Sequence, residues 1–262
     1  MKHITVLLIN PFIYDFSAYS FWSSPLGLLT VGAILRKNGF KINMIDCLRV
    51  MEEKRKDDGR APFLKEKVQP PGCLKGIKKR FRRYGISPET LQQELATIDT
   101  PNLILITSIM TYWYQGTKEA LTILRETFPY AKIVVGGIYP SLCYEHACAT
   151  MTEADLVVGK GEMKRFYAFL EETFNILLTH KLSPDELDSL PYPCFDLYET
   201  IPFIPLLTSK GCMYRCTYCA TPYMHPGIIR KSPQITLDEI LYWHDHGVKR
   251  YVLYDDNFLY KI

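Results

Sequence analysis

Short apolar runs separated by helix-like stretches fill most of residues 1–178, and they constrain the fold more than any other feature. Runs rich in Val, Ile and Leu occur at residues 3–10, 41–47, 102–108, 132–137 and 155–159. They are nearly continuous rather than alternating, as expected for strands that are covered by helices on both faces. Strands that alternate with helices are typical of βαβ units. The pattern predicts an α/β fold with a doubly wound, Rossmann-like parallel sheet of five strands.

The stretches between these runs carry helix signals. Ser24 and Pro25 suit the first turn of a helix over residues 26–35, and Asn38-Gly39 suits its end. Further helices are expected at residues 88–98, 116–128, 141–150 and 162–178.

Residues 48–87 interrupt the pattern with a long charged insertion. From Arg49 to Arg83 there are 13 Lys and Arg against 5 Asp and Glu, whereas the whole chain has a net charge of only +3. Basic loops are usually solvated, but such a loop can also cover a substrate or a nucleic acid. Both interpretations stay open. The low overall charge does not favour nucleic acid or an anionic membrane as a partner.

A proline-rich linker at residues 179–203 separates the first domain, residues 1–178, from a shorter part at residues 204–262. Within the linker, Ser183 and Glu186 have capping-box spacing and predict one short helix. Beyond it we expect a strand at 204–209, a cysteine loop, a helix at 237–246 opened by Thr236 and Glu239, and a strand at 250–255. This order suits the start of a βα barrel. Because a barrel needs roughly 180 to 250 residues, we expect it to be truncated or the chain to be a fragment, with poor turnover.

Three of the eight cysteines, Cys212, Cys216 and Cys219, form a C-x3-C-x2-C motif. The sequence shows no export signal and no membrane-length apolar stretch, so a cytoplasmic location and reduced thiols are expected. Three thiolates can hold three irons of a 4Fe-4S cluster and leave the fourth iron open. The alternative is a zinc site with His225 as fourth ligand. The other five cysteines lack ligand spacing and are expected to be ordinary buried or surface thiols.

The motif and its surroundings resemble the radical S-adenosylmethionine (SAM) family. The resemblance rests on TSKGCMYRCTYCATP, on RKSPQITLDEI and on YVLYDDNF. It implies that the open iron chelates SAM, and that an electron from the cluster cleaves SAM to methionine and a 5′-deoxyadenosyl radical. It also implies an electron donor such as a flavodoxin or ferredoxin. The residues that it assigns to SAM or substrate are Tyr218, Asp255, Asp256 and Asn257.

The carboxyl ends of the strands are where a doubly wound sheet binds its ligand. These ends carry no G-x-G-x-x-G motif, which argues against a dinucleotide. Instead, SPLGLLTVGAILRKNGFKINMIDC, ITSIMTYW, GGIYPS and ADLVVGKGE resemble the cobalamin-binding domain that precedes many radical SAM cores. The resemblance assigns cobalamin binding to residues at these strand ends: Asn10, Pro11, Ser108, Thr111, Gly136, Gly137, Gly159 and Glu162.

One departure concerns the cobalt's lower ligand. The first strand is not followed by D-x-H-x-x-G, and no histidine lies between His3 and His146. This argues against a methionine-synthase-like site more than against cobalamin itself, and a related sheet that binds nothing is the alternative. With both cofactors, the resemblance implies methyl transfer to an unactivated carbon or phosphorus centre of an unknown substrate. The rival functions are radical SAM chemistry without cobalamin and a non-enzymatic zinc module.

Overall fold

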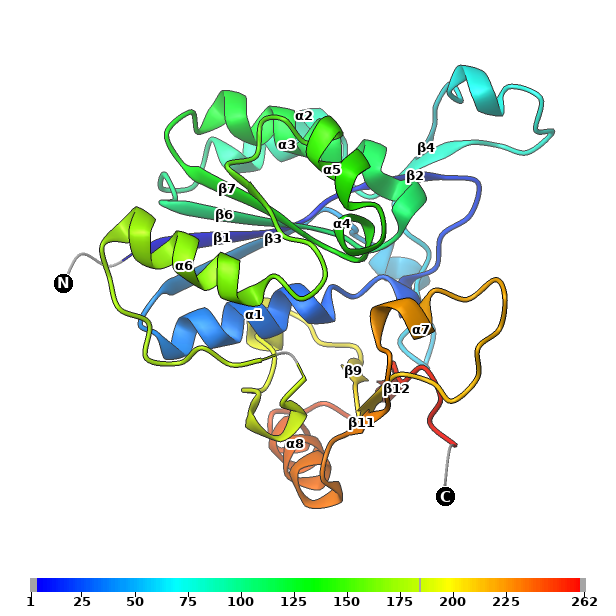
Figure 1. Cartoon of the computed structure of the whole chain (residues 1–262). Coiled ribbons are helices and arrows are strands. Elements are labelled where there is room, and N and C mark those ends of the chain that lie inside the picture. The colour runs from blue at the N-terminus through cyan, green and yellow to red at the C-terminus, as the bar shows by residue number, and fades with distance from the viewer. Residues whose placement is uncertain (1–3, 184, 260–262) are drawn as a thin grey trace. The chain divides into compact units, whose positions relative to one another are not determined.

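Five apolar runs form one parallel sheet in a computed structural model that describes residues 4–183 and 185–259 (Figure 1). The order is β3-β1-β6-β7-β8. The strands are β1 (Thr5–Asn10), β3 (Lys41–Asp46), β6 (Leu103–Ser108), β7 (Lys132–Gly137) and β8 (Leu156–Val157). The result confirms the predicted Rossmann-like α/β sheet, although residue 3 of the first expected strand lies outside the described residues.

The strand order reverses beside β1. In chain order the five strands run 2-1-3-4-5, so β1 pairs in parallel with β3 on one side and with β6 on the other. Crossover connections then leave in opposite directions from the carboxyl ends of β1 and β6. All six residues of β6 are buried, as expected for a central strand. The switch point therefore lies between Asn10 and Ser108.

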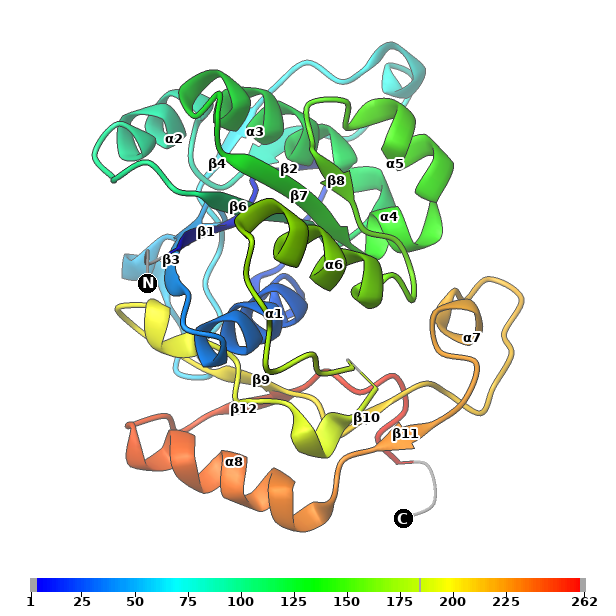
Figure 2. The same ribbon diagram turned by 60° about the vertical axis from the view of Figure 1, so that its left-hand side comes forward.

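Three segments cover one face of this sheet: α2 (Pro88–Leu95), α3 (Tyr114–Thr127) and the pair α4 (Ile138–Leu142) and α5 (Tyr144–Thr150) (Figure 2). The one-turn helix η4 (Thr111–Trp113) leads into α3. Ser87 caps α2 by accepting a hydrogen bond from the Thr90 amide at 3.1 Å. The single helix expected at 141–150 is wrong, because the backbone leaves the helical region at Cys143 and divides it into α4 and α5.

The basic insertion has a core of its own. Its strands β4 (Lys65–Lys67) and β5 (Arg82–Tyr84) join β2 (Ile13–Asp15) in an antiparallel sheet of order β2-β5-β4. The insertion also contains two one-turn helices: η2 (Glu52–Lys54) precedes β4, and η3 (Gly72–Leu74) lies between β4 and β5 in the chain. The buried residues beneath are Ile13, Leu48, Phe63, Tyr84 and Trp113. The insertion is therefore a small folded layer, and the interpretation as a solvated loop describes only its tip.

The chain divides into two compact units, the first ending at Leu28 and resuming over Gly39–Glu162, the second comprising Leu29–Asn38 and the described residues from Met163 onward. Helix α1 (Leu26–Lys37) crosses this division, and α6 (Met163–Phe174) begins the second stretch. Within the second unit, the Asn38 side-chain oxygen accepts the Thr179 and His180 amides at 2.9 and 3.0 Å. Residues after α1 are thereby tied to the expected linker.

The end of the chain forms a βα unit. Strands β9 (Ile204–Leu206) and β12 (Tyr251–Leu253) pair in parallel, and α8 (Pro233–Asp245) lies beside them in Figure 2. The expected strand 204–209 is interrupted, because β10 (Ser209–Lys210) pairs instead with β11 (Ile229–Arg230). Short helices α7 (Thr221–Met224), η5 (Leu187–Ser189) and η6 (Phe195–Leu197) complete the unit.

One helix boundary predicted for this region is wrong. Helix α8 begins four residues before the expected Leu237, because Ser232-Pro233 supplies its N-cap and first residue. In the linker, Glu186 donates its amide to the Ser183 carbonyl at 3.0 Å, and the short 3-10 helix η5 follows directly. No described helix has the length and apolar character that crossing a bilayer requires.

Candidate functional site

The three-cysteine loop joins β10 to α7 in the second unit. Cys212 is partly buried, whereas Cys216 and Cys219 are exposed, and none of the three forms a disulfide. The Cys219 amide donates to the Cys216 carbonyl at 3.0 Å. This i to i+3 bond is that of a β-turn, which brings the first and last of its four residues close together. The C-x2-C spacing therefore places two thiols at the ends of one turn.

Two carboxylates from the end of β12 hold the start of this loop. Asp255 accepts the Thr208 hydroxyl at 2.6 Å and the Ser209 hydroxyl at 2.5 Å. It also accepts the Thr208 amide at 3.2 Å. Hydrogen bonds to a charged acceptor are among the stronger ones in proteins, at about 1.5 to 3 kcal/mol each. Asp255 therefore fixes the chain just before the cysteines.

Asp256 spans the loop. One of its carboxylate oxygens accepts the Gly211 amide at 2.8 Å, and the other accepts the Thr221 hydroxyl at 3.1 Å. These two donors flank the segment that carries all three cysteines. We call Asp255 and Asp256 the carboxylate clamp.

Gly211 fits its place because it has no side chain. Its φ is +88°, and a Cβ there would lie 2.0 Å from the Gly227 carbonyl oxygen. Next to it, burial lowers the pKa of the Lys210 ammonium, and the Asp185 and Asp256 carboxylates partly oppose that shift. The base of the loop is thus tightly packed backbone beside a half-buried cation.

The remaining residues expected to touch SAM lie on or beside the loop. The Asn257 amide nitrogen is 3.7 Å from the Cys212 sulfur, and the Tyr218 side chain is 91% exposed. The structure thus brings Asp255, Asp256 and Asn257 to the cysteine loop. Tyr218 projects from the same loop and contacts none of them.

The donor set suits an iron–sulfur cluster. Thiolates are the ligands that such clusters prefer, and each of three cysteines binds a different iron of a cubane, so the sulfurs need not converge on one point. Among the described residues, no group of three or more His, Cys, Asp or Glu side chains is arranged around one metal position. The alternative of Cys212, Cys216, Cys219 and His225 around one zinc stays open.

The five other cysteines include two that burial makes unreactive. Burial raises the pKa of the Cys47 thiol far above its usual range and that of Cys194 to about 11. Cys73 and Cys148 are exposed, and Cys143 is partly buried. The five cysteines without ligand spacing thus include both buried and surface thiols.

At the switch point of the first unit, one buried polar group lacks a partner. The Ser108 side chain is 2% exposed, and its hydroxyl has no hydrogen-bond partner in the described structure. An orphaned buried hydroxyl costs about 1 to 3 kcal/mol and calls for an explanation, such as a ligand. On the other side of β1, the buried Asn10 amide donates to Asp46 at 2.8 Å.

Two glycines lie at the end of β7, next to Ser108. A Cβ on Gly137, whose φ is +110°, would lie 2.5 Å from the Ser108 carbonyl oxygen, whereas a Cβ on Gly136 would meet nothing within 4 Å. Gly137 thus lets the two backbones approach, and Gly136 leaves open space. Ser108, Gly136 and Gly137 together suit the close passage of a ligand.

The other residues assigned to cobalamin are more dispersed. Pro11 is buried after β1, and Thr111 begins η4. Glu162 accepts the Gly159 amide at 2.7 Å, so these two residues stabilise each other's turn.

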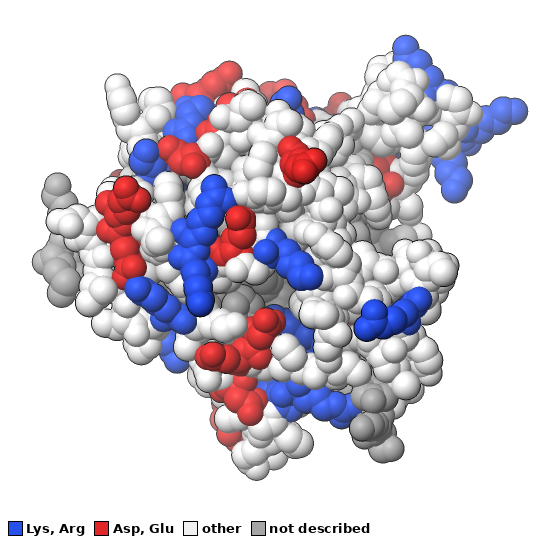
Figure 3. Space-filling view, in the orientation of Figure 1, with Lys and Arg blue, Asp and Glu red and all other residues white. Residues whose placement is uncertain are grey.

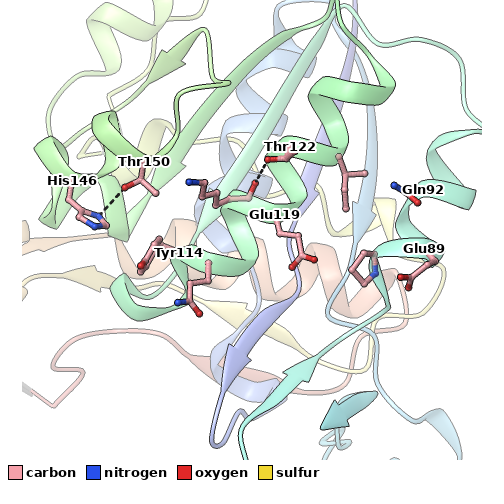
Figure 4. A pocket seen from close by; sticks show the side chains of 11 residues that line it. Glu89, Gln92, Tyr114, Glu119, Thr122, His146 and Thr150 are labelled. Atoms are coloured by element: carbon pink, nitrogen blue, oxygen red, sulfur yellow. Dashed lines mark hydrogen bonds between the residues drawn. The ribbon is translucent and has the colours of Figure 1, made fainter. Parts of the chain in front are cut away.

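A further hollow of about 780 Å³ lies on the outer side of α2, α3 and α5 (Figure 4). Near it, the Tyr139 hydroxyl is 2.6 Å from a ring nitrogen of His146. Burial and a hydrogen bond to Glu119 raise the pKa of Tyr14. None of the residues expected to bind a cofactor lines this hollow. It was not predicted from the sequence, because its lining is spread over separate helices.

The fold and the loop together describe an α/β sheet followed by a βα unit that carries a three-cysteine motif. No protein-family model matches the chain. Two curated proteins resemble it, and they point to the radical SAM superfamily.

The first of these relatives is a cytidylyl-2-hydroxyethylphosphonate methyltransferase from Streptomyces wedmorensis, 24% identical over 98% of this chain and 55% of the relative. The second is the ribosomal protein uS12 methylthiotransferase RimO from Acidothermus cellulolyticus, 36% identical over 21% of this chain and 12% of the relative. The chain spans about half the length of the first relative and a smaller share of the second.

Proposed function

We propose that the chain acts in a radical SAM methyltransferase. The observation that carries the proposal is the carboxylate clamp, which fixes both ends of the loop that carries three free thiols between β10 and α7.

In this proposal Cys212, Cys216 and Cys219 hold a 4Fe-4S cluster and leave one iron open for SAM. The bound cluster supplies the electron that cleaves SAM reductively, and it receives that electron from a donor such as a flavodoxin or ferredoxin. The clamp fixes the path of the backbone at both ends of the loop before the cluster binds. We propose that Asn257, whose amide nitrogen is 3.7 Å from the Cys212 sulfur, and the exposed Tyr218 ring contact SAM.

Cobalamin is the second proposed cofactor, bound at the carboxyl edge of the first unit's sheet. When bound, it supplies the methyl group. The Ser108 hydroxyl would gain the partner it lacks, and Gly136 would let the cofactor approach the backbone. Asn10, Pro11, Thr111, Gly137, Gly159 and Glu162 would shape the same edge.

Methyl transfer is favoured over methylthio transfer by the extent of the two similarities. The alignment with the phosphonate methyltransferase includes both compact units, since it covers 98% of the chain, whereas that with the methylthiotransferase covers 21%. We therefore propose methylation of an unactivated carbon or phosphorus centre of a substrate whose identity stays open.

The test is a metal and sulfide assay on protein prepared and reconstituted without oxygen. We expect about four iron and four sulfide per chain, with a brown chromophore. Cys216→Ala should lose most of both, whereas Cys148→Ala, which also removes an exposed thiol, should keep them. A colourless protein with one zinc and no sulfide would contradict the proposal.

SAM binding is tested on the reduced cluster by electron paramagnetic resonance. Added SAM should change the spectrum, and Asn257→Ala should raise the SAM concentration needed for that change. A spectrum that SAM leaves unaltered would show that no iron is open to it.

A further inference from the structure

A hollow of about 520 Å³ lies on the insertion layer of the first unit. Its wall is formed by the segment 16–21, which follows β2, by the residues around η2, and by strands β4 and β5. Its volume lies within the range of roughly 300 to 1,000 Å³ that small-molecule sites occupy. None of the residues proposed above for the cluster, SAM or cobalamin lines it.

The lining is strongly cationic. It includes Lys56, Arg60, Lys65 and Arg82 and contains no Asp or Glu. Arg60 is neutralised by Asp58 at 2.6 Å. The other three cations form no ion pair in the part of the chain that the structure describes. Lys and Arg side chains also gather at the outer end of the insertion, which projects at the upper right of Figure 3.

The acid opposite Arg82 already has hydrogen-bond partners of its own. Asp15 lies opposite Arg82 in the β2–β5 ladder. Its two oxygens accept the Phe16 amide at 2.6 Å and the Trp113 ring nitrogen at 2.7 Å. A lining with four cations and no acid has a positive potential that favours an anionic ligand.

Aromatic rings form the rest of the wall. Phe16, Phe21 and Tyr84 line the hollow together with Tyr19, whose side chain is 70% exposed. The Tyr84 hydroxyl donates to the Phe16 carbonyl at 3.1 Å, and the Arg60 guanidinium lies 5.5 Å from the centre of the Phe21 ring. The Phe16 ring in turn lies 5.2 Å from the Phe81 ring, edge to face. These three side chains are thus held by neighbours, whereas the mostly exposed Tyr19 ring can stack on a ligand.

We propose that this hollow binds a nucleoside diphosphate or a molecule that contains one. The three unpaired cations would neutralise the phosphates, since Lys and Arg are the usual phosphate-binding side chains. The Tyr19 ring would stack on the base, and such stacking tolerates any base. The inference does not depend on the cluster or on SAM.

The experiment is calorimetric titration of the full chain with CDP and ADP at low and high salt. Binding should weaken as salt rises. The double variant Lys65→Gln with Arg82→Gln should bind about a hundredfold more weakly, tenfold for each cation lost. The matched control is Lys78→Gln with Lys79→Gln, which removes the same charge from the same insertion outside the hollow. It should bind within about twofold of the unsubstituted protein.

Tyr19→Ala separates the base from the phosphates. It should weaken CDP and ADP about tenfold and leave inorganic pyrophosphate unchanged, because pyrophosphate has no ring to stack. The fold at this position should survive, since the Ser23 hydroxyl donates to the Tyr19 carbonyl and the substitution leaves that carbonyl in place. If pyrophosphate binding weakens as much as nucleotide binding, or if no nucleotide binds, the proposal fails.

Two further titrations test whether cobalamin or RNA, rather than a nucleoside diphosphate, occupies the hollow. Cobalamin also carries a phosphate and a planar base, so CDP is titrated into protein saturated with cobalamin. Undiminished CDP binding supports a separate site, whereas displacement by cobalamin overturns the proposal. Tighter binding of single-stranded RNA than of CDP, weakened equally in both double variants, would also overturn it. Cys216→Ala should still bind CDP, so failure of the cluster is distinguishable from failure of this site.

Discussion

Gly211 is the residue whose backbone most directly fixes the cysteine loop. Its φ of +88° and the 2.0 Å approach of a Cβ to the Gly227 carbonyl both exclude a side chain. We expect Gly211→Ala to lower the free energy of unfolding by about 3 kcal/mol, the combined cost of left-handed backbone and a main-chain clash. Urea denaturation of the metal-free protein measures this.

Gly227 provides the control from the other side of the same contact. A Cβ at Gly227 would meet nothing within 4 Å, so Gly227→Ala should change the free energy of unfolding by less than about 1 kcal/mol. Equal losses in the two variants would show that the contact does not restrict the loop.

At Ser108 we expect the opposite effect, because its substitution should raise the free energy of unfolding. Its buried hydroxyl has no partner in the described structure, so Ser108→Ala removes the cost of keeping that group from water. The ligand-free variant should be about 1 kcal/mol more stable to urea than the unsubstituted protein. It should also retain less cobalamin after gel filtration, as expected when a site sacrifices stability for binding.

A second buried serine serves as the comparison. The Ser209 hydroxyl donates to Asp255 at 2.5 Å, so Ser209→Ala leaves an acceptor short of a donor and should destabilise by about 1 to 2 kcal/mol. A stabilising Ser209→Ala, or a destabilising Ser108→Ala, would contradict the assignment.

Among the secondary-structure elements, α3, β7 and β8 are joined by one carboxylate. Asp155 accepts from Arg125 at 2.6 Å, from Lys132 at 3.0 Å and from the Ile133 amide at 2.9 Å. Burial alone would raise the pKa of Asp155, but these hydrogen bonds and charges lower it. A lowered pKa means that Asp155 stabilises the fold above the unfolded-state pKa of about 3.9, and that this contribution is lost as pH falls through the folded pKa.

Asp155→Asn tests this sign. At pH 7 the variant should be less stable than the unsubstituted protein by about 1 kcal/mol. The difference should shrink as pH falls below the unfolded-state pKa of about 3.9 and on through the lower folded-state pKa. Urea midpoints measured from pH 7 to about pH 2 would show it, and a difference that is constant with pH would contradict the role of the charge.

Elements that are buried along their length, and are therefore mostly apolar, could be predicted from the sequence. Strand β6 is buried along its whole length, so its apolar run is unmistakable. Strand β4 is three exposed residues, Lys65–Lys67, and carries no such signal. It exists because β5 pairs with both β4 and β2, which only the folded chain reveals. The start of α8 was missed because the Thr236 and Glu239 spacing resembled a capping box, whereas the helix begins at Pro233 with Ser232 at the N-cap position.

The candidate sites also differ in whether their residues are neighbours in the sequence or meet only in the folded chain. Three cysteines within eight residues are local in sequence, so the motif was visible directly. The clamp is not local, because Asp255 and Thr208 are 47 residues apart and meet only through the parallel pairing of β9 with β12. The cationic hollow likewise draws on three separate segments, so the sequence showed its charge but not its shape.

For the molecule as a whole, every residue proposed for cobalamin belongs to the first compact unit, and the three cysteines belong to the second. Each cofactor should therefore load without the other. Gly136→Val should fold, because a Cβ there meets nothing within 4 Å and valine suits a strand, and the added side chain should exclude cobalamin. We expect Gly136→Val to keep its iron and lose cobalamin.

Cys216→Ala should show the reverse, retaining cobalamin by absorbance after desalting while losing iron and sulfide. Because the two variants differ in the unit that they alter, each is the control for the folding of the other. Loss of both cofactors from either variant, with an unchanged far-ultraviolet circular dichroism spectrum, would show that the two units bind their cofactors jointly. Independent loading would mean that each unit positions its own cofactor with its own residues.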